Sequence, residues 1–167
     1  MDEIKTNRFT ALLSNKNLKL RLFPDAILRK HAGPVHTFDT AMQNFADQMY
    51  AFMKEHLGIG LAAPQVGVLY RIITIDIECV EKFLINPEIL SSSSDRDIER
   101  ERCLSLPEQS FDIDRSLKIE VRGWSLEGRR LHFETNGLHA RVLQHEIDHL
   151  NGILICDKSK RFTVQSN

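Results

Sequence analysis

The chain has 167 residues, of which 42% are hydrophobic and 27% are charged, and its formal net charge is −1. This length suits one folded domain with a real core. The balanced charge gives no direct signal for a nucleic acid or an anionic membrane as a partner, and no apolar run approaches the roughly 20 residues that a membrane-spanning helix needs.

The N-terminus and the cysteines indicate the cellular compartment. The first residues, MDEIKTNRF, carry acidic side chains and no apolar stretch, so they do not resemble a secretory signal or a transit peptide. The three cysteines, Cys79, Cys103 and Cys156, are an odd number and widely spaced, which argues against a disulfide framework. We therefore expect a cytoplasmic protein whose thiols are reduced.

The first part of the chain contains one clear helix. Residues 1–18 are polar and aperiodic, and we expect them to form a loose extension of a single domain that covers residues 1–167. From Met42 to Met53, apolar side chains follow the i, i+3, i+4, i+7 pattern. This periodicity predicts a helix that ends at Gly58.

The middle of the chain is expected to be mainly extended. The stretch GIGLAAPQVG, at residues 58–67, contains glycines and a proline, which argue against a helix and predict an extended segment that other parts approach closely. The polar stretch SSSSDRDIER, at residues 91–100, predicts an exposed loop. Short apolar segments, alternating in three of the four, predict strands at residues 70–77, 83–90, 117–124 and 131–135, the last two joined as a hairpin.

The last predicted element is a helix from Asn136, a suitable N-cap, to Gly152, a suitable stop. It contains the stretch QHEIDHLNG, in which two histidines lie four positions apart. On a helical wheel His145 and His149 are about 40° apart. Leu138 and Val142 share their side of the helix, while other apolar residues occupy another side, so we expect the helix to be buried on both sides.

The two histidines and the glutamate between them form an H-E-x-x-H pattern. Neutral imidazoles one turn apart can bind the same metal ion, and Glu146 would then lie close enough to act on a water bound to it. The alternative is a chance match on a charged helix, in which case the protein would be a non-enzymatic module. Metal analysis of the purified protein separates the two interpretations.

Two histidines leave the metal site incomplete. Metalloproteases with this pattern take a third ligand from farther along the chain, but the matching position here is Ile155, and no glutamate or histidine follows His149. We therefore expect an upstream ligand. A thiolate beside imidazoles suits zinc or ferrous iron. The residues by themselves leave several candidates, namely Cys79 and Cys103 upstream and, downstream, Cys156 and Asp157.

Three stretches carry a resemblance to a known family. GIGLAAPQ at residues 58–65, ERCLS at 101–105 and QHEIDH at 144–149 occur in this order and resemble the three signature motifs of the peptide deformylase family. The resemblance extends over residues 22–157. It implies an α+β fold with antiparallel β-sheets around a central metal-binding helix. It also implies hydrolytic removal of the N-formyl group from the initiator methionine of new peptides.

The resemblance also implies a ligand set and partners. Cys103 would be the third ligand beside His145 and His149, with a water in the fourth position. One divalent metal is expected per chain, with Fe²⁺ first and Ni²⁺, Co²⁺ or Zn²⁺ as alternatives. The expected partners are N-formylated nascent peptides, and the ribosome is a candidate partner that the sequence does not specify.

Further residues acquire roles from the same resemblance. Glu146 would take a proton from the attacking water and deliver it to the leaving amine. The side-chain amide of Gln65 and the backbone N–H of Leu104 would stabilise the oxyanion. The expected substrate contacts are Gly58, Ile59 and Gly60 along the peptide backbone, Glu101 and Arg102 in the middle motif, and Leu138 and Val142 beside the methionine side chain.

One position departs from the family pattern. The middle motif normally has glycine between the glutamate and the cysteine, and this chain has Arg102. An arginine there can crowd the peptide or turn outward and contact it. Two further alternatives therefore stay open: a deformylase-like paralogue with weak or altered activity, and a zinc endopeptidase.

Overall fold

The structure, a computed structural model, describes residues 18–78 and 81–159. The expected N-terminal extension lies outside these ranges except for Leu18, and Cys79 also lies outside them. The described residues form two long helices, α2 (Thr40–Glu55) and α3 (Gly137–Leu150), with the strands between them in sequence. Three short helical segments complete the list: η1 (Ala26–Arg29), η2 (Ala63–Val66) and α4 (Ile155–Lys158).

The strands form two antiparallel sheets. The larger sheet has the order β1-β2-β3-β6-β7, and the smaller one is the hairpin β4-β5. The strand bounds are Gly60–Ala62 (β1), Ile72–Ile75 (β2), Phe83–Ser92 (β3), Arg96–Cys103 (β4), Leu106–Ser116 (β5), Lys118–Trp124 (β6) and Arg130–Asn136 (β7). The predicted hairpin between β6 and β7 is confirmed, with Gly128 in its turn.

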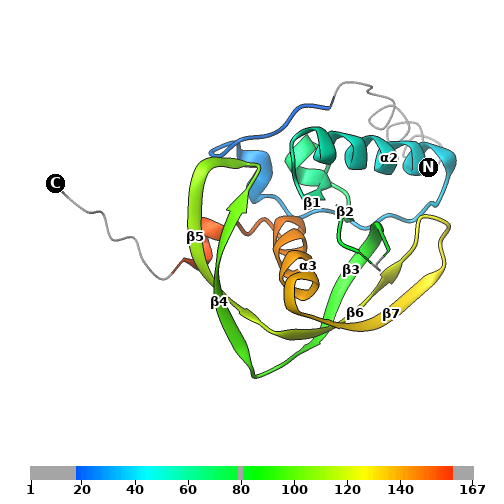
Figure 1. Cartoon of the computed structure of the whole chain (residues 1–167). Coiled ribbons are helices and arrows are strands. Elements are labelled where there is room, and N and C mark those ends of the chain that lie inside the picture. The colour runs from blue at the N-terminus through cyan, green and yellow to red at the C-terminus, as the bar shows by residue number, and fades with distance from the viewer. Residues whose placement is uncertain (1–17, 79–80, 160–167) are drawn as a thin grey trace.

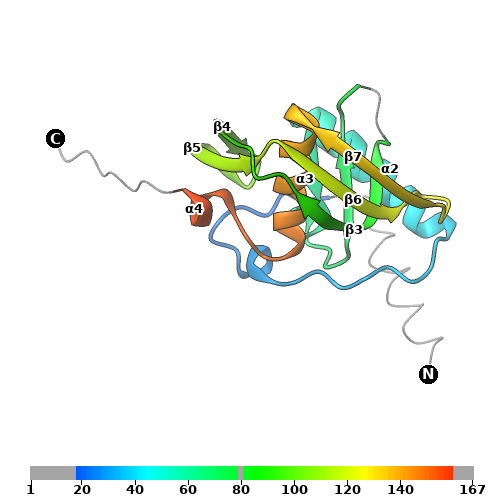
Figure 2. The same ribbon diagram turned by 90° about the horizontal axis from the view of Figure 1, so that it is seen from below.

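Helix α3 occupies the centre of the molecule. Figures 1 and 2 show it between the β4-β5 hairpin and the larger sheet, with α2 on another side of that sheet. The buried residues Leu143, Ile147 and Leu150 of α3 pack with Ile73 of β2 and Val121 of β6. The α+β architecture around a central helix is thus confirmed.

Helix α2 was predicted from its apolar periodicity and is present, with its apolar face in the core. Its end differs from the prediction. The helix stops at Glu55, and Leu57 rather than Gly58 takes the left-handed conformation, with φ 57°. The N–H groups of Leu57 and Gly58 donate to the carbonyls of Lys54 and Met53, which is a Schellman motif. Gly58 serves close packing instead, because a β-carbon there would lie 3.0 Å from Leu104 Cδ1.

The stretch after α2 is only partly extended. Gly60–Ala62 pairs with β2, as an extended segment should. Ala63–Val66 instead forms a 3₁₀ turn, with Pro64 as its second residue. Proline fits the first turn of a helix because its missing N–H has no partner there. The prediction of an extended segment is therefore right for Gly60–Ala62 and wrong for Ala63–Val66.

The expected exposed loop at residues 91–100 is wrong. Strand β3 continues to Ser92 and β4 begins at Arg96, so only a short turn separates them. The sequence is polar here because residues 96–100 of β4 are all exposed, and Arg96 and Arg100 pair across the hairpin with Asp114 and Asp112. Cross-strand pairs of this kind stabilise a strand that has no apolar alternation.

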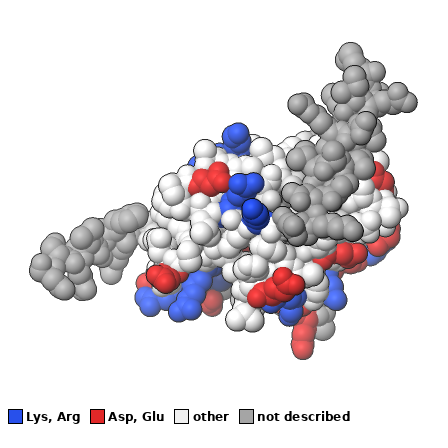
Figure 3. All heavy atoms as spheres, turned by 90° about the horizontal axis from the view of Figure 1, so that it is seen from above, with Lys and Arg blue, Asp and Glu red and all other residues white. Residues whose placement is uncertain are grey.

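Helix α3 begins and ends where the sequence predicted. Asn136 is its N-cap residue, although its side chain makes no capping hydrogen bond, and Gly152 follows the last turn with φ 73°. Within the described residues, no helix is long and apolar enough to cross a membrane. On the face shown in Figure 3, acidic and basic side chains lie intermixed.

Candidate metal centre and active site

The two histidines of α3 meet a cysteine from β4. Nε2 of His145 lies 3.2 Å from Nε2 of His149, and Sγ of Cys103 lies 3.3 Å from the latter. One ligand atom from each residue falls within 4.8 Å of the others, and all three residues are buried or nearly so. The third ligand that the helix lacked is therefore available from the end of β4, as the resemblance implied.

The donor set fits a divalent transition metal. Metal–nitrogen and metal–sulfur bonds of roughly 2.0–2.3 Å in a tetrahedral site place the ligand atoms about 3.3–3.7 Å apart, close to the spacing of these three residues. Burial lowers the pKa of His149 well below its ordinary value, which keeps the neutral form that a metal ligand needs. Thiolate and imidazole donors suit Fe²⁺ or Zn²⁺ better than Mg²⁺ or Ca²⁺.

The two downstream candidates for the third ligand lie elsewhere. Asp157 forms an ion pair with Arg29, and Cys156 Sγ lies 3.9 Å from Nη2 of the same arginine. Both residues belong to the short helix α4, and neither is part of the ligand group found among the described residues.

Glu146 lies beside this ligand group with an unsatisfied carboxylate oxygen. Its side chain is 4% exposed, and Oε2 has no hydrogen-bond partner in the described structure. Burial raises the pKa of Glu146 to about 7. The backbone of Gly60 passes so close that a β-carbon there would lie 2.9 Å from Glu146 Cδ. The carboxylate is therefore held in a narrow site against β1.

Gln65 is positioned by the turn that follows β1. Its Oε1 accepts a hydrogen bond of 2.9 Å from the N–H of Ala62, which fixes the side chain within the 3₁₀ turn. Its Nε2 donates to Ser105 Oγ at 3.1 Å and lies 3.6 Å from Cys103 Sγ. The amide N–H group of Gln65 thus points toward the cluster.

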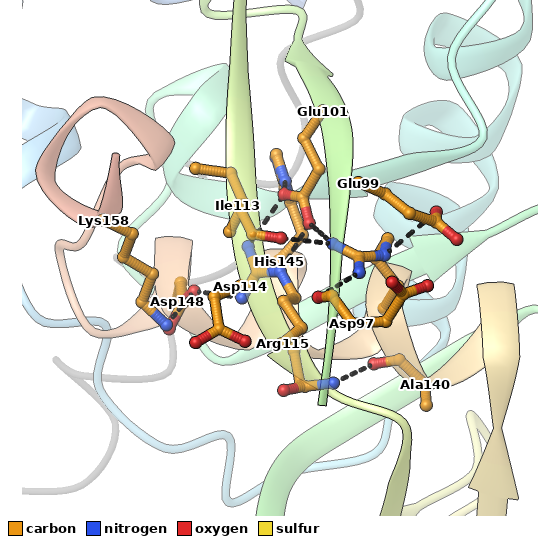
Figure 4. Close-up of polar contacts among 12 residues, drawn as sticks. Asp97, Glu99, Glu101, Ile113, Asp114, Arg115, Ala140, His145, Asp148 and Lys158 are labelled. Atoms are coloured by element: carbon orange, nitrogen blue, oxygen red, sulfur yellow. Dashed lines mark hydrogen bonds and ion pairs between the residues drawn. The ribbon is translucent and has the colours of Figure 1, made fainter. Parts of the chain in front are cut away.

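Glu101 lines the cavity and also has partners that the sequence did not predict. It lies two residues before Cys103 on the same inward face of β4 and is 6% exposed. His145 Nδ1 donates to Glu101 Oε2 at 2.9 Å, which leaves Nε2 with its lone pair toward the cluster. Arg115 donates to both carboxylate oxygens, at 2.6 and 2.9 Å (Figure 4). Arg141 donates to Oε1 at 2.8 Å.

These contacts make Glu101 the centre of a buried ion network. Although burial opposes ionisation, His145 and Arg115 hold the pKa of Glu101 far below its usual range. Arg115 also donates to Asp148 on α3 at 2.7 Å, so the network ties the β4-β5 hairpin to the helix. A buried carboxylate shared by cations in this way fixes the histidine ring more firmly than a solvent-exposed partner could.

The sequence analysis did not single out Arg115, Arg141 or Ser105. Two weak signals were available. Arg115 follows Ile113 at an inward position of β5, and Arg141 lies one turn before His145 on a helix expected to be buried on both sides. A charged residue on a buried face needs a partner of opposite charge. Which carboxylate supplies it depends on the tertiary structure.

A single cavity of about 580 Å³ brings most of the predicted residues together. His149 lies behind its wall, 1% exposed. Leu138 is 54% exposed and Ile59 47% exposed, so they form its rim. The predicted residues that line it are Gly58, Ile59, Gly60, Gln65, Glu101, Arg102, Cys103, Leu104, Leu138, Val142, His145 and Glu146.

The comparisons with known proteins agree with one another. The family model described as polypeptide deformylase matches residues 17–165. A peptide deformylase of Thermotoga neapolitana is 44% identical over 142 residues, which cover 85% of this chain and 87% of the relative. One of Thermodesulfovibrio yellowstonii is 42% identical over 146 residues, covering 84% of this chain and 88% of the relative.

Solved structures give the same result. The crystal structure of peptide deformylase from Thermotoga maritima has a TM-score of 0.84 and 40% identity, covering 86% of this chain and 98% of that one. The peptide deformylase of Synechococcus elongatus in complex with actinonin has a TM-score of 0.85 and 38% identity, covering 89% of this chain and 82% of that one. Because the family model matches residues 17–165 and both the sequence and the fold of known members match over most of the chain, this chain belongs to the polypeptide deformylase family.

Proposed function

We propose that this chain is a metal-dependent hydrolase that removes the N-formyl group from the N-terminal formyl-methionine of newly made peptides. The observation that carries the proposal is the Glu146 carboxylate. It has an unpartnered oxygen in the described structure and lies beside a Cys-His-His ligand group in the same cavity. Membership of the polypeptide deformylase family supports the same reaction.

The metal would be held by Cys103, His145 and His149, whose donor atoms fit one divalent ion. When bound, such an ion activates water as a nucleophile near neutral pH. We propose Fe²⁺ as the native metal, with Ni²⁺, Co²⁺ or Zn²⁺ as ions that the same donors can bind. Loss of activity in air by the iron form, but not by the nickel form, would support this choice, because iron and Cys103 can oxidise.

Glu146 would handle the proton of the reaction. Water attacks the formyl carbon, the bond from that carbon to nitrogen breaks, and formate and a free α-amine result. Glu146 takes a proton from the attacking water and delivers it to the departing nitrogen. Its buried position against Gly60 keeps bulk water from competing for that proton.

Gln65 and Leu104 would stabilise the negative charge that develops on the formyl oxygen. Gln65 Nε2 lies 3.6 Å from Cys103 Sγ, and Leu104 lines the same cavity. Donors that are already oriented lower the barrier because they need no reorganisation during the reaction. Ser105 contributes by holding the Gln65 amide in place.

The peptide would lie extended between two free strand edges. β1 is the edge strand of the larger sheet, and β4 has a described neighbour, β5, on one side only. Gly58, Ile59 and Gly60 line one wall of the cavity, and the end of β4 lines the other. An added peptide strand can bond to such edges through its backbone. Val142 and Leu138 would receive the methionine side chain.

The alternatives raised by the sequence receive no support from these observations. A zinc endopeptidase of the usual kind takes its third ligand downstream, whereas the ligand group here uses Cys103 upstream. A weakened paralogue was considered because of Arg102, whose side chain is exposed rather than folded over the ligand group. Arg102→Gly should then raise activity little.

The proposed function is tested by formate release from formyl-Met-Ala-Ser. Anaerobically purified protein loaded with Fe²⁺ or Ni²⁺ should release formate rapidly, and the Glu146→Ala protein, with the same metal content, should not. One metal per chain without release of formate would contradict the proposal. Inhibition by actinonin, which is bound in the Synechococcus elongatus relative, would show that the released formate comes from this site. We also propose that the protein acts in the cytoplasm, where thiols such as Cys103 stay reduced.

A further inference from the structure

The arginines on the exposed face of β4 differ in their partners. Arg100 Nε donates to Asp112 Oδ1 across the hairpin at 3.2 Å. Arg102, the next residue on that face, lies opposite Ser110, whose hydroxyl cannot neutralise a guanidinium. No hydrogen bond or ion pair joins the Arg102 side chain to another residue in the described ranges 18–78 and 81–159. Its charge is therefore available to a ligand.

Arg102 lies at the rim of the active-site cavity. It directly precedes Cys103 and is one of the cavity-lining residues, yet its side chain is exposed. Glu101 and Cys103 point toward α3, so Arg102 occupies the opposite face of β4, as the alternation of a strand requires. A ligand in the cavity would pass the backbone of Arg102 on its way to solvent.

The same alternation applies to a peptide that is added to the free edge of β4. If the methionine side chain points inward to Val142, the side chain of the next residue points outward, on the face of Arg102. Side chains opposite each other on neighbouring strands have β-carbons roughly 5 Å apart, which a guanidinium can easily span. The second residue of the peptide is thus the one that Arg102 can reach.

We propose that Arg102 is a specificity-determining residue that favours peptides with an aspartate or glutamate directly after formyl-methionine. This inference rests on the proposed function and names the substrate class within it. Two exposed acidic residues also line the cavity, Glu99 and Glu108, and Glu99 is already paired with Arg141. Glu108 should weaken the preference for an acidic residue without reversing it.

The test compares kcat/KM for three peptides, formyl-Met-Asp-Ala, formyl-Met-Asn-Ala and formyl-Met-Lys-Ala, with nickel-loaded protein at low salt. We expect the aspartate peptide to exceed the asparagine peptide about two- to five-fold, the range of an exposed ion pair, and the lysine peptide to be slowest. The advantage should shrink at high salt, because exposed charges are screened. Glu108→Gln should enlarge it.

Matched variants identify the residue responsible. Arg102→Ser should remove the advantage of the aspartate peptide, and Arg102→Glu should reverse the order so that the lysine peptide becomes the fastest. Arg100→Ser is the control, because Arg100 lies on the same face but is already paired with Asp112. Equal kcat/KM for the three peptides, or an unchanged preference in Arg102→Ser, would overturn the inference.

A binding experiment separates this inference from the proposed function. Titration calorimetry of the same three peptides with metal-loaded Glu146→Ala protein measures the preference without turnover. If the wild type releases no formate from any peptide, the proposed function fails, and the calorimetric order still decides the role of Arg102. Tighter binding of the aspartate peptide that disappears on Arg102→Ser supports it, and equal binding contradicts it.

Discussion

The backbone of Gly60 lies against the carboxylate of Glu146, so a β-carbon at position 60 would be 2.9 Å from Glu146 Cδ and equally close to Val142 Cγ1. Gly60→Ala should therefore displace the carboxylate. We expect a loss on the order of 100-fold in kcat/KM for formate release, because small displacements of a reacting group have effects of this size. Metal content, measured by mass spectrometry of the purified protein, should not change.

Gly33 provides the control for this substitution. A β-carbon there would meet its nearest atom, the carbonyl oxygen of Leu69, at 3.8 Å, which is an ordinary contact. Gly33→Ala should leave kcat/KM within a factor of two of the wild-type value, or about 0.4 kcal/mol. Equal losses in the two variants would indicate a general effect on folding instead of a displaced Glu146.

Metal binding should depend on one of the two described cysteines. Cys103→Ala should lose the metal, and its melting temperature should fall to that of the chelator-treated wild type, because the ion stabilises only the folded state. Cys156→Ala should keep one metal per chain, since Cys156 lies near Arg29 and outside the ligand group. A Cys103→Ala protein with its full metal content would exclude this ligand set.

The ion network around Glu101 should matter for both stability and metal affinity. Glu101→Gln removes the charge that Arg115 and Arg141 share in a buried site, and breaking such a group lowers the free energy of unfolding by about 3–5 kcal/mol. The weaker support of His145 should lower metal affinity about 10- to 100-fold. Denaturant titration and competition with a chelator measure the two effects.

Glu99 gives the matched comparison. Its carboxylate pairs with Arg141 at 3.2 Å, but its side chain is 55% exposed. Glu99→Gln should change the free energy of unfolding by less than about 1 kcal/mol, as is usual for exposed ion pairs. Equal free energies of unfolding for the two variants would show that the buried Glu101 network stabilises the fold no more than an exposed ion pair does.

Ser105 should affect catalysis through Gln65. Its Oγ accepts from Gln65 Nε2 at 3.1 Å, so Ser105→Ala leaves that amide free to turn. We expect kcat to fall about five- to ten-fold, equivalent to roughly 1 kcal/mol, against about 100- to 1,000-fold for Gln65→Ala. A double variant no slower than Gln65→Ala would show that Ser105 acts only by positioning that amide.

His139 should make stability depend on pH. Its Nδ1 lies 2.6 Å from Thr135 Oγ1, its Nε2 has no partner in the described structure, and burial lowers its pKa. The unfolded chain therefore binds this proton more readily, and the free energy of unfolding should fall as the pH drops below about 6.5 toward the lowered value.

The comparison for His139 uses the metal-free protein, so that release of the ion does not contribute. Urea titrations between about pH 7 and pH 5 should show a steeper loss of unfolding free energy for the wild type than for His139→Leu, in which the titrating group is absent. Parallel curves for the two proteins would mean that His139 is protonated equally in the folded and unfolded states.

The sequence by itself determined the features that depend on neighbours along the chain. The apolar periodicity of α2 and α3 was sufficient to place both helices, because burial of one face follows directly from a spacing of 3.6 residues per turn. The same helical geometry places His145 and His149 side by side. Two of the three protein ligands of the candidate metal site were therefore predictable from local geometry.

The tertiary structure decided what depends on distant residues. Cys103 is 42 positions before His145 in the sequence, and it reaches the histidines only because β4 and β5 form a hairpin beside α3. The family resemblance supplied this ligand, whereas spacing alone left four candidates. The polar stretch before it was predicted to be a loop, since a strand stabilised by cross-strand ion pairs has no apolar alternation to reveal it.

The network around Glu101 is another feature that the tertiary structure decided. The family resemblance led us to expect that its carboxylate contacts substrate. In the folded chain Arg115 and Arg141 arrive from β5 and α3 and enclose it. A buried carboxylate is stable only when such partners surround it, and which partners do so is decided by the packing of three elements, not by the order of the residues along the chain.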